Sequence, residues 1–309
     1  MAPATGRTTQ GKASSEQSVP RFADRLQDRK RLLVTSEVVP PKGTDVGDVV
    51  QAVSVLRGYV DAVNVTDGSG AMMRASSLVT SKVVLDTGVD PIFQITCRDR
   101  NRLALQADLL GAYILGIRNI LGLTGDDPKA GDHPDAKPVF DLTSAQLMQA
   151  ARGMADGKDM AGKALTGHAK FCIGAAADPG AKDLDVEFKK FESKIAGGAE
   201  FFQTQAVFEA EPVQRFMERA KSYGKPVLVG CLFVKSAKMA RYMNEHVWGI
   251  HVPEAQIDRL ERASDPRAES LAIMVELLQR LKDVADGFHF YPLGWDELVP
   301  QALKAAGVR

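Results

Sequence analysis

One ionisable side chain stands out in the first apolar run of the chain. Glu37 lies within LLVTSEVVPP, residues 32–41, inside an aliphatic stretch that ends at a double proline. A buried carboxylate is costly unless it has a partner or a chemical task, and apolar surroundings favour its protonated form. A carboxyl group that keeps its proton near neutral pH can act as a general acid. The structural alternative is an ion pair with Lys or Arg at the rim of a sheet.

Polar groups also follow the later apolar runs of the chain. They are Thr66 and Asp67, Gln94 and Thr96, Thr124 to Asp126, Asp178, Gln203 and Gln205, Lys235, and Tyr291. The beginnings of the runs, such as Arg31, Ala62 and Pro226, carry no comparable cluster. If the runs are parallel strands, their carboxyl ends share one face of the fold. These polar groups are therefore expected to meet at one mouth.

The elements that must position these groups alternate along the chain. Strand-like segments cover residues 31–37, 61–66, 91–96, 119–125, 170–177, 200–208, 226–233 and 287–293. Helical patterns cover 46–59, 75–88, 100–116, 142–155, 183–198, 210–224, 236–245, 265–284 and 296–307. Eight such strand–helix units predict an α/β fold, a single (β/α)₈ TIM barrel. A doubly wound sheet is less favoured because no GxGxxG motif or P-loop is present.

Two helices carry specific local expectations. In 100–116, the apolar residues Leu103, Ala107, Leu110 and Ile114 recur at helical spacing. In 142–155, Thr143 is a plausible N-cap residue.

The composition bounds the domain organisation and the class of partner. Residues 1–20 are polar and predict a disordered tail, and residues 21–309 are expected to form one (β/α)₈ barrel, the catalytic domain. Lys plus Arg and Asp plus Glu both number 39, so no basic excess indicates a nucleic-acid partner. No apolar run is long enough for a membrane span, and the N-terminus lacks a secretory signal, so we expect a cytoplasmic protein. The three separated cysteines indicate neither a disulfide framework nor a metal site.

Six segments in this order resemble one known family. They are SEVVPPKG (36–43), NVTDG (64–68), ITCRDRNR (95–102), NILGLTGDDP (119–128), DPGAKDLDVEFKKFESKIAGGAEFFQTQAVFE (178–209) and GFHFYPLG (287–294). Together they resemble the catalytic barrel of the bacterial-type methylenetetrahydrofolate reductases. The resemblance implies reduction of 5,10-methylenetetrahydrofolate to 5-methyltetrahydrofolate. In that family NADH or NADPH reduces a bound FAD, which passes hydride to the tetrahydrofolate substrate.

The resemblance also implies roles for individual residues. Glu37 matches the catalytic acid, and Asp126 matches the acid that recognises the pterin. Gln205 matches a substrate-contacting glutamine, and Tyr291 and Leu293 are expected to line the substrate pocket. The positions that match cofactor contacts are Thr66, Gln94, Thr124, Gly125, Asp178, Lys190 and Lys194.

Several of these cofactor positions depart from the family pattern. Gln94 stands for a histidine, Thr124 for an arginine and Asp178 for a histidine. Gly174 stands for an aromatic residue near the end of the fifth strand, and Ser193 for an arginine. Two cations that would meet the FAD phosphates are thus missing, while an acid has been gained.

These departures leave three cofactor arrangements open. The chain could bind FAD weakly or through other groups, bind a shorter flavin or one supplied by a partner subunit, or take hydride directly from NADH or NADPH. A folate-binding methyltransferase and a non-catalytic subunit of a one-carbon enzyme complex are alternative functions. The expected assembly is a homo-oligomer or a partner subunit of such a complex.

Overall fold

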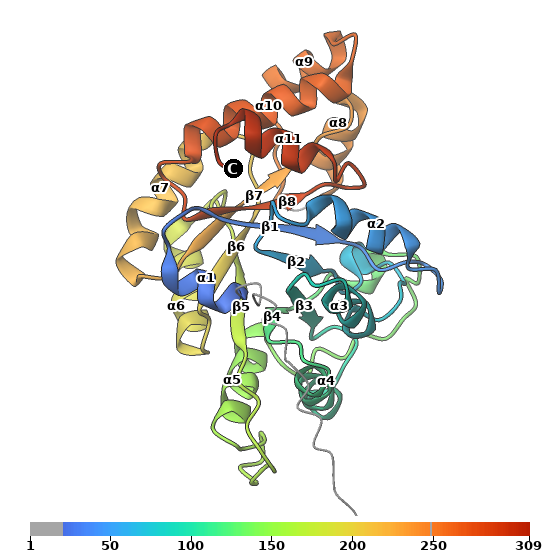
Figure 1. Cartoon of the computed structure of the whole chain (residues 1–309), viewed down its shortest axis with the longest axis vertical. Coiled ribbons are helices and arrows are strands. Elements are labelled where there is room, and N and C mark those ends of the chain that lie inside the picture. Colours follow the sequence, from blue (N-terminus) through green and yellow to red (C-terminus); the bar gives the residue numbers. More distant parts are fainter. Residues whose placement is uncertain (1–20, 248) are drawn as a thin grey trace, which may run out of the picture.

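A closed barrel of eight parallel strands forms the centre of the molecule (Figure 1). The computed structural model describes residues 21–247 and 249–309, so the predicted tail at residues 1–20 lies outside the described residues. The strands are β1 (Leu33–Val38), β2 (Ala62–Val65), β3 (Pro91–Thr96), β4 (Asn119–Leu123), β5 (Cys172–Ala177), β6 (Phe201–Ala206), β7 (Val227–Leu232) and β8 (Gly287–Tyr291). Each strand pairs with the next in sequence, and β8 closes on β1. The predicted TIM barrel is confirmed.

Helices surround the barrel and follow the strands along the chain (Figure 1). They are α1 (Phe22–Asp28), α2 (Gly47–Leu56), α3 (Ser77–Asp86), α4 (Arg102–Ile114), α5 (Ser144–Ala155), α6 (Leu184–Ala196), α7 (Ala210–Ala220), α8 (Ala237–His246), α9 (Glu254–Arg262), α10 (Pro266–Leu281) and α11 (Leu298–Ala305). Short 3₁₀ turns occupy Ser69–Ala71, Pro128–Ala130 and Lys221–Tyr223. Of these helices, α1 and α9 were not predicted from the sequence. None of the described helices is both long and apolar enough to cross a membrane.

Side-chain caps fix where several of these helices begin. The hydroxyl of Thr143 accepts the backbone N–H of Gln146, and the Gln146 side chain accepts the Thr143 N–H, which completes a capping box at α5. The predicted cap at Thr143 is therefore confirmed. Asp183 and Asp265 cap α6 and α10, each with one carboxylate oxygen that accepts two backbone N–H groups of the first turn.

The buried face of α4 differs from the apolar spacing that we singled out in the sequence. Leu103 and Ile114 are 73% and 83% exposed, whereas Leu105, Leu109 and Ala112 are buried. Apolar residues lie all around this helix, so two helical stripes fit its sequence equally well. Only the packing against the barrel distinguishes them.

An apolar floor closes the amino-terminal end of the barrel. Phe22 and Leu26 of α1 pack there against inward-facing residues of seven strands, namely Leu33, Ala62, Ile92, Leu121, Cys172, Phe201 and Leu228. The Phe22 and Phe201 rings meet edge to face, with centroids 5.1 Å apart. Helix α1 thus covers the end of the barrel opposite the predicted mouth.

Gly174 belongs to this interior packing and not to the mouth. It is the third residue of β5, and a Cβ atom at this position would overlap the ring of Phe201. The comparison with an aromatic residue near the end of strand five was therefore wrong. The missing side chain makes room for Phe201, which fills the lower barrel.

Candidate functional site

Glu37 lies near the carboxyl end of β1 and is almost completely buried, with 9% of the residue exposed. Burial raises the pKa of its carboxyl group from the ordinary 4.5 to about 8. Its nearest basic group in the described part of the chain is Nε2 of His289, 3.9 Å from Oε2. The alternative of an ion pair with Lys or Arg is not seen among the described residues. The geometry thus favours a neutral carboxyl group that can donate a proton.

A polar layer lies inside the barrel directly beneath Glu37. The side chains of Thr35, Asn64, Gln203 and His289 are at most 3% exposed and are joined by hydrogen bonds. Branched apolar residues are usual in this position of a TIM barrel. Except for Gln203, the sequence analysis did not single them out. The alternation of strand side chains could have identified them. For example, Thr35 and His289 lie two positions before Glu37 and Tyr291 and therefore face the barrel interior as they do.

Of the other residues expected near the substrate, Gln205 lies on β6, Tyr291 ends β8 and Leu293 lies just after it. The hydroxyl of Tyr291 donates to the carbonyl of Thr204 at 2.8 Å, and its ring meets His289 edge to face at 4.7 Å. Leu293 is partly exposed and has a positive φ of 50°. Such strain in a non-glycine residue often accompanies functional loops. Gln205 is half-buried where the pairing of β6 with β7 is irregular.

Asp126 lies in the exposed loop that follows β4. Its Oδ2 atom accepts the backbone N–H of Gly70, which lies in the β2–α3 loop, at 2.8 Å. The preceding Gly125 has a φ of 93°, and a Cβ atom there would come within 2.9 Å of Arg98. Thr124 is exposed beside it. Asp126 therefore already holds two mouth loops together, and its second oxygen is available to a ligand donor.

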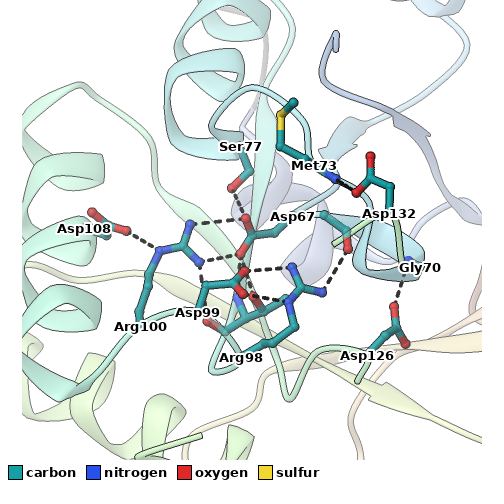
Figure 2. Close-up of polar contacts among 12 residues, drawn as sticks. Asp67, Gly70, Met73, Ser77, Arg98, Asp99, Arg100, Asp108, Asp126 and Asp132 are labelled. Atoms are coloured by element: carbon teal, nitrogen blue, oxygen red, sulfur yellow. Dashed lines mark hydrogen bonds and ion pairs between the residues drawn. The ribbon is translucent and has the colours of Figure 1, made fainter. Parts of the chain in front are cut away.

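Charged side chains lock the loops after β2 and β3 (Figure 2). Asp67 accepts hydrogen bonds from Arg100, from the Thr96 backbone and hydroxyl, and from Ser77. Arg98 forms a bidentate pair with Asp99 and donates to the Gly68 carbonyl. Figure 2 shows these contacts together with those of Asp126 and Asp132. Asp67 thus lies in the loop after β2 and stabilises the loops of the mouth.

The double proline after Glu37 joins the same assembly. The carbonyl of Pro41 accepts the backbone N–H of Ala75 at 2.8 Å, and Lys42 pairs with Asp132 at 2.7 Å. Asp132 also accepts the backbone N–H of Met73 at 2.8 Å. The loops after β1, β2 and β4 are thus joined at one side of the mouth.

Two of the expected cofactor residues face the barrel interior. Thr66 is 2% exposed, and its hydroxyl has no hydrogen-bond partner in the described part of the chain. Gln94 is also buried, on β3. An unpaired buried hydroxyl is costly and marks a place where a ligand atom could complete a hydrogen bond. These residues fit the polar edge of a bound ring system.

The positions expected to meet the FAD phosphates are poorly suited to the diphosphate of FAD. Burial raises the pKa of Asp178, whose backbone N–H donates to Glu187 at 3.1 Å. Lys190 pairs with Glu187 at 3.5 Å, and the ammonium of Lys194 donates to the Ala176 carbonyl at 2.6 Å. Burial also lowers the pKa of Lys194. Both lysines are therefore engaged by the protein, beside two acids that would repel a diphosphate.

No group of three or more His, Cys, Asp or Glu side chains suited to a metal ion occurs among the described residues. The three cysteines are buried and unpaired. Burial raises the pKa of the Cys97 thiol to about 11, which fits an unreactive residue of the core.

Comparison with known proteins adds independent information. The profile described as "Methylenetetrahydrofolate reductase" matches residues 21–307. The chain is 24% identical over 301 residues to methylenetetrahydrofolate reductase 1 of Schizosaccharomyces pombe, covering 91% of this chain and 47% of that protein. It is 27% identical over 296 residues to the 5,10-methylenetetrahydrofolate reductase of Pectobacterium carotovorum, covering 90% and 91%. The chain thus spans about half the length of the yeast relative and most of the bacterial one.

Among solved structures, a 2,3-dimethylmalate lyase aligns with a TM-score of 0.50 at 10% identity, covering 91% of this chain and 83% of that one. At 10% sequence identity, this similarity shows that the two proteins share the barrel fold and says nothing about a shared function. The profile match, in contrast, covers nearly the whole described chain. This chain belongs to the methylenetetrahydrofolate reductase family.

Proposed function

We propose that the protein reduces 5,10-methylenetetrahydrofolate to 5-methyltetrahydrofolate at the mouth of the barrel, with NADH or NADPH as the source of hydride. The observation that carries this proposal is Glu37, a buried and neutral carboxyl group at the end of β1 in a chain of this family. Asp126, Gln205 and Leu293 supply the surrounding substrate contacts. The setting that we propose is the cytoplasm.

The chemistry requires one proton and one hydride. Glu37 gives its proton to the leaving nitrogen of the imidazolidine ring, the ring opens, and the methylene carbon becomes an iminium carbon. Hydride adds to that carbon and completes the methyl group. A pKa raised to about 8 keeps the acid protonated near neutral pH. Asp126 can accept hydrogen bonds from the amino and N–H donors of the pterin through its free oxygen.

Direct hydride transfer from the nicotinamide is the route that the site favours over a tightly bound FAD. Its support is the pair of acids, Asp178 and Glu187, beside the two engaged lysines at the expected phosphate positions. Family members generally use a flavin together with NADH or NADPH, so the hydride route of this chain needs its own test. Thr66 and Gln94 can then border the nicotinamide ring.

The activity is tested with the purified chain, methylenetetrahydrofolate, and NADH or NADPH. We expect oxidation of the nucleotide to depend on the folate, and we expect Glu37→Gln to lower kcat by at least about a hundredfold, the contribution typical of a general acid. Folate binding, measured by calorimetry, should persist in the variant. No folate-dependent oxidation of either nucleotide, with or without added FAD, would overturn the proposal.

The hydride route is tested by the visible spectrum of the same preparation. We expect no flavin absorbance, and we expect added FAD to leave the rate unchanged. A stoichiometric flavin spectrum, or activity that appears only when FAD is added, would show that the chain uses a flavin in spite of Asp178 and Glu187.

A further inference from the structure

A continuous hydrogen-bond chain links four buried side chains below the acid. The amides of Asn64 and Gln203 pair with each other, with distances of 2.7 Å and 3.0 Å. The Nε2 atom of Gln203 also lies 2.9 Å from the hydroxyl oxygen of Thr35, and that oxygen lies 2.9 Å from Nδ1 of His289. The chain therefore crosses the barrel interior and ends at an imidazole.

The number of protons on each group gives this chain a direction. Gln203 Oε1 accepts from Asn64, so its Nε2 group is the donor toward Thr35. The hydroxyl of Thr35 carries one proton, which remains for His289 Nδ1. Nδ1 is then the acceptor, so the proton of the neutral imidazole is on Nε2. That nitrogen is the one 3.9 Å from Glu37 Oε2.

The imidazole is held neutral and in a fixed orientation. His289 is 1% exposed, and burial lowers its pKa to about 3. The Tyr291 ring packs edge to face against it, and the Tyr291 hydroxyl is tied to the Thr204 carbonyl. The imidazole can therefore offer Glu37 a hydrogen bond without adding a positive charge.

We propose that the chain Asn64–Gln203–Thr35 fixes the Nε2–H tautomer of His289, which makes His289 a positioning residue for Glu37. The inference rests on the proposed function, in which Glu37 becomes a carboxylate once it has protonated the folate. Closing the 3.9 Å gap brings Nε2–H into hydrogen-bond range of that carboxylate. The negative charge is then stabilised by an uncharged donor at the step in which it forms.

The pH dependence of this site involves few other groups. Among the described residues, Tyr291 on β8 is the titratable group besides His289 that lies close enough to Glu37 to interact with its charge, and Cys231 on β7 interacts in turn with Tyr291. Burial raises the pKa of both, so both stay neutral at pH 7. A shift in the alkaline limb of the rate profile would therefore report Glu37.

The tautomer can be measured directly by ¹⁵N NMR of histidine-labelled full-length protein. His289 is buried, whereas the other four of the five histidines are exposed, and its lowered pKa means that its signal should stay constant between pH 5 and 8. We expect a protonated Nε2 and an unprotonated Nδ1. If both amides were flipped, the chain would reverse and place the proton on Nδ1. That tautomer, or an imidazolium at pH 7, would overturn the proposal whether or not the protein reduces folate.

Variants then connect the tautomer to the acid. Thr35→Val removes the hydroxyl with little change of shape, and Thr35→Ser keeps it. We expect Thr35→Val to lose the single-tautomer signal and to lower kcat about tenfold with KM for the folate nearly unchanged. Its alkaline limb should move to higher pH, because the Glu37 carboxylate has lost a donor. Thr35→Ser should retain the tautomer.

The control is Ser36→Ala on the same strand. The Ser36 hydroxyl is buried and has no partner in the described part of the chain, so it is outside the hydrogen-bond chain. This variant should keep both the tautomer and the pH profile. If Ser36→Ala lowered kcat and disturbed the tautomer as much as Thr35→Val, the cause would be a general disturbance of β1. That result would contradict the positioning role of His289.

Discussion

At the scale of single residues, burial and not a nearby charge sets the chemistry of Glu37. The only cause found for its raised pKa is loss of water. The same burial weakens the fold at neutral pH, because the unfolded chain would release this proton at a lower pH than the folded one. The acid is thus retained at the expense of stability, as is common at functional sites.

This cost can be measured with Glu37→Gln. Because the folded pKa of about 8 exceeds the ordinary 4.5, the native state holds more protons, and its stability falls as pH rises between these values. We expect the free energy of unfolding of the variant to exceed that of the wild type by on the order of 3 kcal/mol at pH 7, with almost no difference at pH 4.5. Urea unfolding across this range is the measurement.

The matched control is Glu218→Gln, since Glu218 is exposed on α7. It should follow the wild type at every pH. If Glu37→Gln also ran parallel to the wild type from pH 4.5 to 8, the carboxyl group would titrate normally and its role as a neutral acid would be untenable.

At the scale of elements, the eight strands could be predicted because each is a short apolar run bounded by polar turns. Helix α1 was missed because seven residues are too few to show a period, and its helical state depends on packing Phe22 and Leu26 against the barrel. Glu37 and Asp126 could be placed at strand ends from the sequence. Their contacts could not, because the partners His289 and Gly70 are distant in the chain.

The loop after β4 gives a test that separates structure from recognition. Asp126→Asn keeps an oxygen that can accept the Gly70 N–H but removes the charge. We expect KM for methylenetetrahydrofolate to rise about tenfold, because hydrogen bonds to a charged group are stronger than neutral ones. The unfolding midpoint should remain close to that of the wild type. Steady-state kinetics and thermal unfolding measure the two effects.

Asp126→Ala is the companion variant, and it should lower the unfolding midpoint as well, since the Gly70 N–H then loses its partner. An unchanged KM in Asp126→Asn would show that Asp126 is only a brace between the loops.

At the scale of the whole molecule, α1 contributes more than its length suggests. It joins the inward residues of seven strands into one apolar cluster. We expect Phe22→Ala to lower the free energy of unfolding by about 3–5 kcal/mol, the usual cost of truncating a buried aromatic ring. Val79→Ala on α3, which is 61% exposed, is the control and should change stability by less than about 0.5 kcal/mol.

Denaturant unfolding of Phe22→Ala and Val79→Ala measures how much α1 contributes to the stability of the barrel. Equal effects at the two positions would mean that α1 is an appendage to a barrel that is stable without it.

The apolar floor of the barrel also bears on when Glu37 can regain its proton during the reaction. The apolar cluster of α1 and seven strands separates the polar layer beneath Glu37 from the amino-terminal end of the barrel, so we expect protons to reach Glu37 through the mouth. In the proposed reaction the folate occupies that mouth until the methyl product leaves. Proton uptake must then follow product departure, and the acid is recharged once per cycle, only in the empty enzyme.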